Sequence, residues 1–220
     1  MCYCINPSCR HRDIVDTPIE CPSCHTTLRV KDRYLLVKPL RRLDIPHPYA
    51  EIFQVQDLKD NHTSKVLKIL KNNGTKLVEL FDQEASFLIN LIHSGIPRAE
   101  EQFSLTLGNG QELHCLVMER IEGENLEQWL KPNKQISQAQ ALEWMRQLVT
   151  ILDDVHQKRF FHRDIKPSNI MRKPDGKLVL IDFGTAREVT QTVINGQDVT
   201  VVYSDGYTAP EQIQGHAVPQ

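Results

Sequence analysis

Apolar residues along the chain recur with two different spacings, which predict strands in some stretches and helices in others. Short runs rich in apolar and β-branched residues are typical of buried strands, and they occur at residues 34–37, 52–56, 66–70, 113–118, 169–172 and 178–181. Apolar positions three or four residues apart predict a helix from about Thr75 to His93 and another that begins at Ser137 with a capping box to Gln140. Gly108-Asn109-Gly110 predicts a hairpin turn before the strand at 113–118.

The last two of these strands flank Asp175-Gly176, a dipeptide that is typical of a two-residue hairpin turn. Residues equally distant from such a turn lie opposite each other, so Asn169 would face Asp182 with Cβ atoms roughly 5 Å apart. An amide oxygen and a carboxylate at that separation suit Mg²⁺, which binds few protein oxygens and completes its shell with water and phosphate. The pattern predicts a magnesium site beside this hairpin.

Two further charged residues precede the same hairpin. Asp164 lies five residues before Asn169, and Lys166 stands between them, followed by Pro167, which restricts the local backbone. This spacing would place a carboxylate base and a cation beside the metal. These three groups together are typical of a phosphoryl-transfer site. The alternative is a surface hairpin with solvated charges.

The segment His162-Arg163-Asp164, with four residues before Asn169, and the later Asp182-Phe183-Gly184 resemble the catalytic loop and the metal-binding loop of eukaryotic-type protein kinases. The resemblance implies that Asp164 accepts the proton of the substrate hydroxyl, that Asn169 and Asp182 hold Mg²⁺, and that Lys166 steadies the γ-phosphate of ATP. A lysine two residues after the aspartate is similar to the serine/threonine branch. The implied fold is α+β with two lobes, an antiparallel sheet plus a helix and then a partial helical lobe.

Two charged residues interrupt the apolar pattern upstream. Lys68 is flanked on its own face of the strand by Val66 and Leu70, and Glu84 lies on the apolar stripe of the following helix. Because buried charges are normally paired, we expect these two side chains to form an ion pair. The kinase resemblance assigns to Lys68 the contact with the α- and β-phosphates and to Glu84 its positioning. The alternative is a lysine that reaches solvent at a strand edge and a glutamate at a helix rim.

The strand at 113–118 and the residues after it correspond, by the same resemblance, to the hinge that holds adenine. Met118 would stand behind the adenine, and the backbones of Glu119 and Ile121 would hydrogen-bond its edge. Cys115 is interpreted as a small core residue rather than a reactive thiol.

The chain departs from the kinase pattern before its second strand. Kinases cover the ATP phosphates with a glycine-rich loop, whereas residues 41–50 read RRLDIPHPYA and the chain has no glycine before Gly74. Arg41 or Arg42 could supply the phosphate contact instead, or both could be solvated charges.

After Gly184 the sequence is polar and rich in threonine up to Ala209-Pro210-Glu211, which resembles the motif that closes the kinase activation segment. A phosphate on this segment could pair with Arg163. The candidate acceptors are Thr190, Thr192, Thr200 and Ser204.

Composition fits a globular chain and gives no global indication of a partner. The 220 residues are 25% charged and 40% hydrophobic, with a formal net charge of −2. That balance gives no reason to expect nucleic acid or a membrane surface as the partner. No apolar run approaches the roughly 20 residues that span a bilayer, and the first residues lack a secretory pattern. We therefore expect a cytoplasmic protein.

Five of the six cysteines fall within the first 24 residues. Cys4 and Cys9 form one pair and Cys21 and Cys24 a tighter pair, so four thiolates on two turns could close a tetrahedral Zn²⁺ site. The spare candidates are Cys2, which could replace Cys4, and His11 and His25. The alternative is a redox-active or disordered cysteine-rich tail. Bacterial serine/threonine kinases with an N-terminal four-cysteine motif are similar to this arrangement, which favours a zinc ribbon.

The expected organisation is a zinc ribbon over residues 1–32 and a kinase domain over 33–220. Within the domain the first lobe would cover about 33–118, the hinge 119–123 and a partial second lobe 124–220. The resemblance covers roughly residues 33 to 219, about two-thirds of a kinase domain of the usual size. On this basis we expect the 220-residue chain, as a C-terminally truncated kinase, to express poorly and to have little activity alone.

Three classes of function remain open from the sequence. The leading one is a serine/threonine protein kinase that uses ATP and Mg²⁺, acts on protein substrates in signalling, and carries a zinc ribbon for docking a protein partner or for regulation. The second is a pseudokinase scaffold that binds ATP, which the glycine-free loop favours. The third is a zinc-ribbon binding module for nucleic acid, for which Tyr3 is the sole aromatic residue among the basic residues of the ribbon and stacking has thin support.

Overall fold

The computed structural model describes residues 1–41, 43, 50–71, 73–133, 135–184, 187–188, 206–208 and 210. The chain divides into two compact units. The first unit contains Met1–Ala85 and Arg98–Arg120, and the second contains Ser86–Pro97 and Ile121–Gln220. Several predicted residues lie outside the described ones, namely Arg42, Thr190, Thr192, Thr200, Ser204, Ala209 and Glu211.

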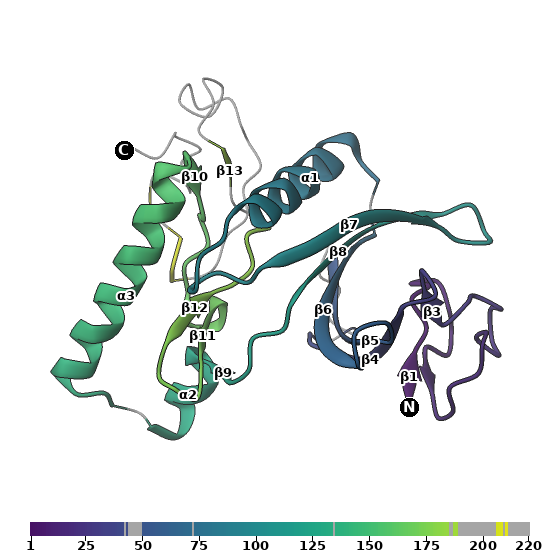
Figure 1. Ribbon diagram of the computed structural model, residues 1–220, viewed down its shortest axis with the longest axis horizontal. Helices are drawn as coiled ribbons and strands as arrows, with labels where there is room; N and C mark the ends of the chain where they lie inside the picture. Colours follow the sequence, from purple (N-terminus) through teal and green to yellow (C-terminus); the bar gives the residue numbers. More distant parts are fainter. Residues whose placement is uncertain are drawn as a thin grey trace. The chain divides into compact units, whose positions relative to one another are not determined.

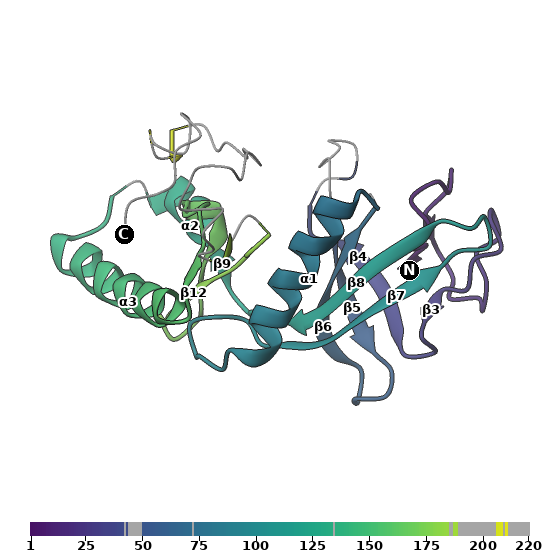
Figure 2. The ribbon, with the colours of Figure 1, turned by 90° about the horizontal axis from the view of Figure 1, so that it is seen from above.

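The first unit is built on a six-stranded antiparallel sheet with the order β3-β4-β5-β6-β8-β7. Figure 2 shows strands β4, β5, β6 and β8 side by side with the β7–β8 hairpin extending beyond them. The strands are β3 (Arg29–Val30), β4 (Tyr34–Pro39), β5 (Ala50–Asp57), β6 (Thr63–Leu70), β7 (Ala99–Thr106) and β8 (Glu112–Glu119). The four predicted strands of this unit are therefore confirmed, as is the hairpin turn at Gly110, whose amide donates to the carbonyl of Leu107.

Strand β7 was not predicted as an element. Its sequence, AEEQFSLT, is mostly polar, and only Ala99 is buried in it. An edge strand needs few apolar residues, because one of its two sides has no partner strand. The sheet order places β7 at such an edge.

The core of the first unit lies on one face of this sheet. Alternate residues of β5 and β6, such as Phe53, Val55, Leu67 and Ile69, are almost fully buried. Ile5, from the cysteine-rich segment, belongs to the same cluster and is 1% exposed. The cysteine-rich segment and the sheet thus share a hydrophobic core.

The cysteine-rich segment also has a small cluster of its own. Strand β1 (Cys2–Tyr3) pairs with β2 (Asp13–Ile14), with Cys2 opposite Ile14. Around this pair lie buried Cys4, Cys9, Cys21 and Leu28. Figure 1 shows the segment wound into loops next to β3 and β4.

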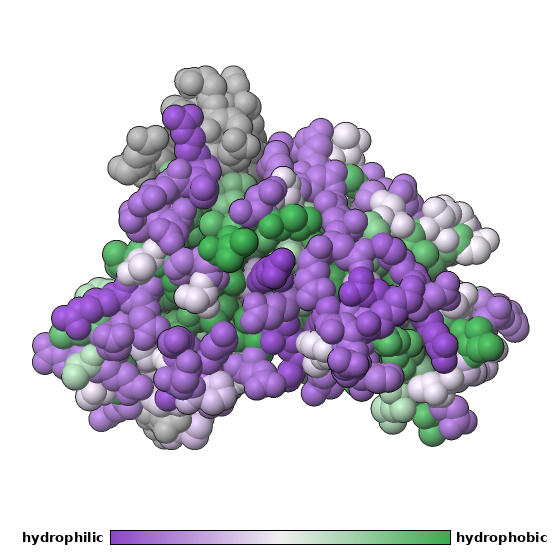
Figure 3. All heavy atoms as spheres, in the orientation of Figure 1, coloured by the Kyte–Doolittle hydropathy of each residue, from purple (hydrophilic) through white to green (hydrophobic). Residues whose placement is uncertain are grey.

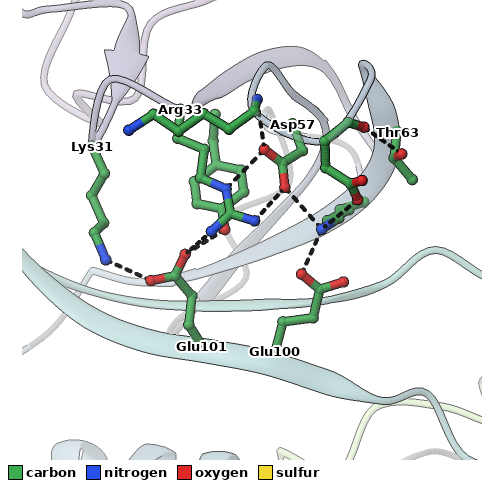
Figure 4. A network of polar contacts seen from close by, with 10 residues as sticks. Lys31, Arg33, Asp57, Thr63, Glu100 and Glu101 are labelled. Carbon is green, nitrogen blue, oxygen red and sulfur yellow. Dashed lines mark hydrogen bonds and ion pairs between the residues drawn. The ribbon is translucent and has the colours of Figure 1, made fainter.

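A network of charges, buried at Asp57 and Lys65 and half-buried elsewhere, joins the two ends of the sheet order (Figure 4). The guanidinium of Arg33 contacts Asp57 at 2.7 Å and Glu101 at 3.2 Å, and Lys65 contacts Asp57 at 2.8 Å and Glu100 at 2.5 Å. Because Glu100 and Glu101 belong to β7 while Arg33 directly precedes β4, these contacts require a strongly curled sheet. Sequence patterning did not predict this network.

Helix α1 (Thr75–Asn90) follows the sheet strand β6 and ends three residues before the predicted end at His93. Leu80, Phe81, Glu84 and Leu88 form its buried face. The predicted helical stripe, including its glutamate, is therefore confirmed.

Among its described residues, the second unit contains a small three-stranded sheet and two helices. The sheet has the order β12-β11-β9, formed by β9 (Glu124–Asn125), β11 (Ile170–Arg172) and β12 (Leu178–Leu180). The other elements are α2 (Leu126–Asn133), α3 (Gln138–Gln157), β10 (Phe160–Phe161), the 3₁₀ turn η1 (Pro167–Asn169) and β13 (Arg187–Glu188). The carbonyl of Gly95 accepts a hydrogen bond from the Leu180 amide, which fixes the segment after α1 against β12.

Helix α3 begins as predicted, because the Ser137 side chain accepts a hydrogen bond from the Gln140 amide at 3.2 Å. Its buried residues are Trp144, Ile151 and Val155. The helix contacts β10 and β12, and the Trp144 ring packs edge-on against Trp129 of α2. Leu142, Met145 and Val149 are exposed. On the face shown in Figure 3, apolar areas are interspersed among hydrophilic ones. Among the described residues, no helix combines the length and apolar character needed to cross a bilayer.

The predicted register of the β11–β12 hairpin is wrong by one residue. Met171 lies opposite Val179, and the Ile181 amide donates to the carbonyl of Asn169, so Asn169 faces Ile181 instead of Asp182. The reason is the turn, because the Lys173 amide bonds the carbonyl of Lys177 and leaves three residues in the loop. The last of the three, Gly176, has a φ of 86°, which is typical of a hairpin loop closed by a left-handed residue.

Candidate functional site

Lys68 and Glu84 form the predicted ion pair within the first unit. Lys68 Nζ lies 2.6 Å from Glu84 Oε1 and 2.7 Å from Oε2, and both side chains are less than a tenth exposed. Lys68 stands in the central strand β6, with Ile52 and Leu116 opposite it on the neighbouring strands. The alternative of two separate, solvent-reaching charges is therefore wrong. The contact of Lys68 with the ATP phosphates stays a prediction.

Asp164, Lys166 and Asn169 lie together in the second unit. Asn169 Nδ2 donates to the carbonyl of Asp164 at 2.9 Å and to its Oδ2 at 2.8 Å, while Lys166 Nζ lies 2.8 Å from the same Oδ2. The 3₁₀ turn η1, which starts at Pro167, brings Asn169 back over Asp164 and buries it to 1% exposure. Because the amide nitrogen of Asn169 faces Asp164, its amide oxygen is the atom suited to ligate a cation.

His162 connects this loop to the segment that carries Asp182. Its Nε2 donates to the carbonyl of Ile181 at 3.0 Å, and its Nδ1 accepts from the Asp164 amide at 3.3 Å. Burial lowers the pKa of His162, which matches a neutral ring with the proton on Nε2. The sequence places His162 in the motif but does not indicate its role. Its position two residues before Asp164 was the available signal.

Asp182 follows β12 with a φ of 66°, a left-handed conformation that few residues other than glycine adopt readily. The next residue, Phe183, is 1% exposed and packs edge-on against the His162 ring, with 4.7 Å between ring centroids. Asp182 and Asn169 thus belong to neighbouring positions of one hairpin, although they are not directly opposite. A Mg²⁺ ion shared by the two remains a prediction.

The predicted adenine-binding residues lie at the end of β8 and just after it. Met118 is half-buried, and the amide of Glu119 donates to the carbonyl of Arg98 at 2.8 Å. Because the Glu119 amide is already engaged, the Glu119 carbonyl is the backbone group of this residue that suits the amino group of adenine. Ile121 is buried at the start of the second unit. Burial raises the pKa of the Cys115 thiol to about 12, which agrees with its interpretation as a core residue.

Cys4, Cys9, Cys21 and Cys24 converge on one point, and their Sγ atoms all lie within 4.8 Å of one another. Cys4 is 3.5 Å from Cys24 and Cys9 is 3.7 Å from Cys21. Four thiolates at about 2.3 Å from a tetrahedral Zn²⁺ would be about 3.8 Å apart, so this donor set fits zinc. The predicted clustering is confirmed, and a disordered tail is excluded.

The spare candidates lie outside this group. The Cys2 thiol donates to the carbonyl of Asp16 at 3.2 Å, and His11 and His25 are exposed. Burial alone would raise the pKa of Cys24, but hydrogen bonds from Thr26 and from the Cys4 and Cys9 thiols lower it to about 6. A thiol that ionises so easily is a ready metal ligand.

The division into two compact units, the buried lysine–glutamate pair and the loop that brings Asp164, Lys166 and Asn169 together are features of the protein-kinase class. The family model described as "Protein kinase domain" matches residues 49–220, so the chain belongs to this family. It is 28% identical over 232 residues to serine/threonine-protein kinase B of Synechocystis sp. (strain ATCC 27184 / PCC 6803 / Kazusa), an alignment that covers 97% of the chain and 38% of the relative.

Other relatives carry the same description. The chain is 40% identical over 201 residues to serine/threonine-protein kinase PknA of Nostoc sp. (strain PCC 7120 / SAG 25.82 / UTEX 2576), covering 85% of the chain and 34% of the relative. It is 31% identical over 151 residues to serine/threonine-protein kinase PrkC of Bacillus subtilis (strain 168), covering 69% and 22%. The chain thus spans well under half the length of these curated relatives.

Proposed function

We propose that this chain is the catalytic part of a serine/threonine protein kinase that transfers the γ-phosphate of ATP to protein hydroxyl groups. The observation that carries the proposal is the convergence of Asp164, Lys166 and Asn169, with both side-chain contacts to one carboxylate oxygen at 2.8 Å. A positioned carboxylate beside a cation and an amide oxygen is the arrangement that phosphoryl transfer needs.

In the proposed reaction Asp164 accepts the proton of a serine or threonine hydroxyl. The hydroxyl oxygen forms a bond to the γ-phosphorus, the bond from that phosphorus to the bridging oxygen breaks, and ADP leaves. Lys166 offsets the negative charge on the transferred phosphoryl group. Mg²⁺, held by Asn169 and Asp182, would neutralise the phosphates. His162 keeps the loop and the segment of Asp182 in register through its two ring nitrogens.

The same proposal assigns the nucleotide contacts to the residues that the sequence predicted. Lys68, oriented by Glu84, would bind the α- and β-phosphates. The carbonyl of Glu119 and the amide of Ile121 would hydrogen-bond the adenine edge, with Met118 behind the ring. This assignment of the Glu119 carbonyl is supported by the hydrogen bond that the Glu119 amide donates to the carbonyl of Arg98, because the amide is then already used.

We also propose that the four cysteines bind one Zn²⁺ ion and that the zinc ribbon docks a protein partner. The support for zinc is the convergence of the four sulfur atoms within 4.8 Å. The docking role rests on the sequence alone. The cytoplasmic location expected from the sequence stays a prediction, to be checked by cell fractionation.

The test is phosphate transfer from γ-labelled ATP to a mixture of protein substrates, combined with a separate measurement of nucleotide binding. We expect transfer by the wild type, and its loss in Asp164→Ala, Asp182→Ala and Lys68→Ala. Nucleotide binding should persist in Asp164→Ala, because this residue acts on the hydroxyl rather than on ATP. Binding without transfer in the wild type, unchanged by Asp164→Ala, would select the pseudokinase scaffold favoured by the glycine-free segment before β5.

A further inference from the structure

Arg12 links the cysteine cluster to the sheet of the first unit. Its Nε donates to the carbonyl of Cys4 at 3.0 Å, and its own carbonyl accepts from the Cys4 amide at 2.8 Å. Its two Nη atoms also bind the two carboxylate oxygens of Glu51 in β5, at 3.0 and 2.7 Å. One side chain therefore touches the backbone of a predicted metal ligand and a strand of the kinase sheet.

This link is buried and directional. The side chains of Arg12 and Glu51 are 12% and 9% exposed. A two-pronged guanidinium–carboxylate pair tolerates little rotation, and a charge left alone in such surroundings is costly. The guanidinium also lies over the ring of Phe53, 5.3 Å from its centroid, and that ring packs against Tyr3 of β1.

Glu51 occupies a position from which it can affect Lys68. It lies opposite Ile69 in the β5–β6 ladder, and the next residue, Ile52, lies opposite Lys68. The ammonium of Lys71, just after β6, is 3.3 Å from Glu51 Oε1. Glu51 is thus tied to β6 next to the proposed phosphate-binding lysine, at Ile69, and just beyond the strand, at Lys71.

We propose that Arg12 is a positioning residue through which Zn²⁺ at the four cysteines sets the nucleotide affinity of the sheet. With the metal bound, the Cys4 turn holds Arg12, Arg12 holds Glu51 and the start of β5, and β5 holds the strand of Lys68. Without the metal, the Cys4 turn loses its anchor, and the guanidinium loses its fixed orientation toward Glu51. This inference rests on the proposed function for the identity of the ligand.

The experiment measures the affinity of the full chain for Mg²⁺–ADP with zinc bound and after zinc is removed by a chelator. In the wild type, zinc removal is expected to weaken binding about tenfold, within the usual range for coupling between two sites. Arg12→Met and Glu51→Gln are expected to bind about tenfold more weakly with zinc present and to show almost no further zinc dependence, because coupled changes do not add. Arg10→Met, at an exposed arginine of the same segment, should behave as the wild type.

Hydrogen exchange provides a second readout that does not depend on nucleotide. Zinc removal should speed exchange of the β5 amides in the wild type, Arg12→Met should show that fast exchange even with zinc, and the β8 amides should stay protected in both. If a variant fails to fold, Arg12→Lys takes its place, because it keeps the charge but loses the two-pronged contact.

The outcomes separate the two proposals. If the zinc-loaded wild type binds no nucleotide, the proposed function fails, and the exchange of β5 alone decides the role of Arg12. The role of Arg12 is overturned if nucleotide binds but neither its affinity nor the hydrogen exchange of β5 changes when zinc is removed. It is also overturned if Arg12→Met keeps the full zinc dependence of the wild type.

Discussion

Lys68 Nζ lies within 2.7 Å of both carboxylate oxygens of Glu84, and neither side chain has more than a tenth of its surface exposed. The two charges come from a strand and from the following helix, sixteen residues apart in the chain. Burial of either charge alone would be energetically costly, so each side chain stabilises the other in its buried position. The pair thereby holds the lysine in one orientation.

Removal of either partner should destabilise the first unit. Lys68→Met leaves a buried carboxylate without its cation, which costs about 3 kcal/mol. The double variant Lys68→Met/Glu84→Gln should be less destabilised than the sum of the single variants, because the second change removes the unpaired charge. Urea unfolding of the four proteins measures this difference, and additive effects would show that the pair is not energetically coupled.

A second prediction concerns Asn169, whose amide nitrogen faces the carboxylate of Asp164 at 2.8 Å. Asn169→Asp replaces this donor with a second carboxylate, and like charges at that distance raise the pKa of one of them. The acid limb of the pH–rate profile for phosphate transfer should therefore move to higher pH, with a rate loss of about 100-fold or more near pH 7. Ser168→Ala, the preceding residue, is the matched control and should leave the profile in place.

The buried network around Asp57 predicts a loss of stability in acid. The hydrogen bonds from Arg33 hold the pKa of Asp57 well below its usual value, and Lys65 adds to this effect. A lowered pKa stabilises the folded state above the ordinary carboxyl pKa of about 4, and this contribution is lost as the pH falls toward the lowered value. Stability should therefore decline from about pH 5 downward.

Asp57→Asn tests the source of this decline. At pH 7 the variant should be about 3 kcal/mol less stable, because Arg33 and Lys65 lose their fully buried anion. The difference from the wild type should shrink as the pH falls below about 4, since the unfolded wild-type chain then binds a proton at Asp57 that the folded state does not bind. Asp60→Asn removes a half-exposed partner of Lys65 and should change stability by less than about 1 kcal/mol. Equal losses in the two variants at pH 7 would contradict the assignment.

The cysteine cluster predicts one zinc ion per chain and a definite set of ligands. Cys21→Ser and Cys24→Ser should each abolish stoichiometric zinc, because a tetrahedral site closed by three thiolates binds far less tightly. Cys2→Ser should retain zinc, since the Cys2 thiol points to the carbonyl of Asp16. Metal analysis of the purified proteins measures the zinc content directly. Loss of zinc in Cys2→Ser would show that Cys2 is one of the zinc ligands.

Much of the site could be predicted because its residues are unusual in their local context. A lysine in an apolar strand and a glutamate on an apolar helical stripe were each anomalous, and burial made pairing the economical explanation. The convergence of Asp164, Lys166 and Asn169 could be predicted because they are close in sequence and a single turn brings them together. Cysteine spacing predicted the cluster of four cysteines for the same reason.

The misses share a different cause. The β11–β12 register depended on one extra loop residue, and a slip of one position moves every pair along a ladder. The two roles of His162 required its ring nitrogens to be placed against backbone groups that carry no sequence signal. Strand β7 was missed because edge strands do not need an apolar pattern.

The sequence by itself determined the family, the clustering of four cysteines, the lysine–glutamate pair and the position of most strands and helices. These features depend on contacts between residues near in the chain, or on periodicity along a single element. Only the tertiary structure decided that Arg12 reaches Glu51 and that Arg33 joins Asp57 to Glu101, across up to 68 residues of sequence. Such contacts depend on how the sheet curls and where the cysteine-rich segment packs against it. Arg12, Arg33 and Asp57 lie in polar stretches of the sequence, where no apolar pattern marks a charge as buried.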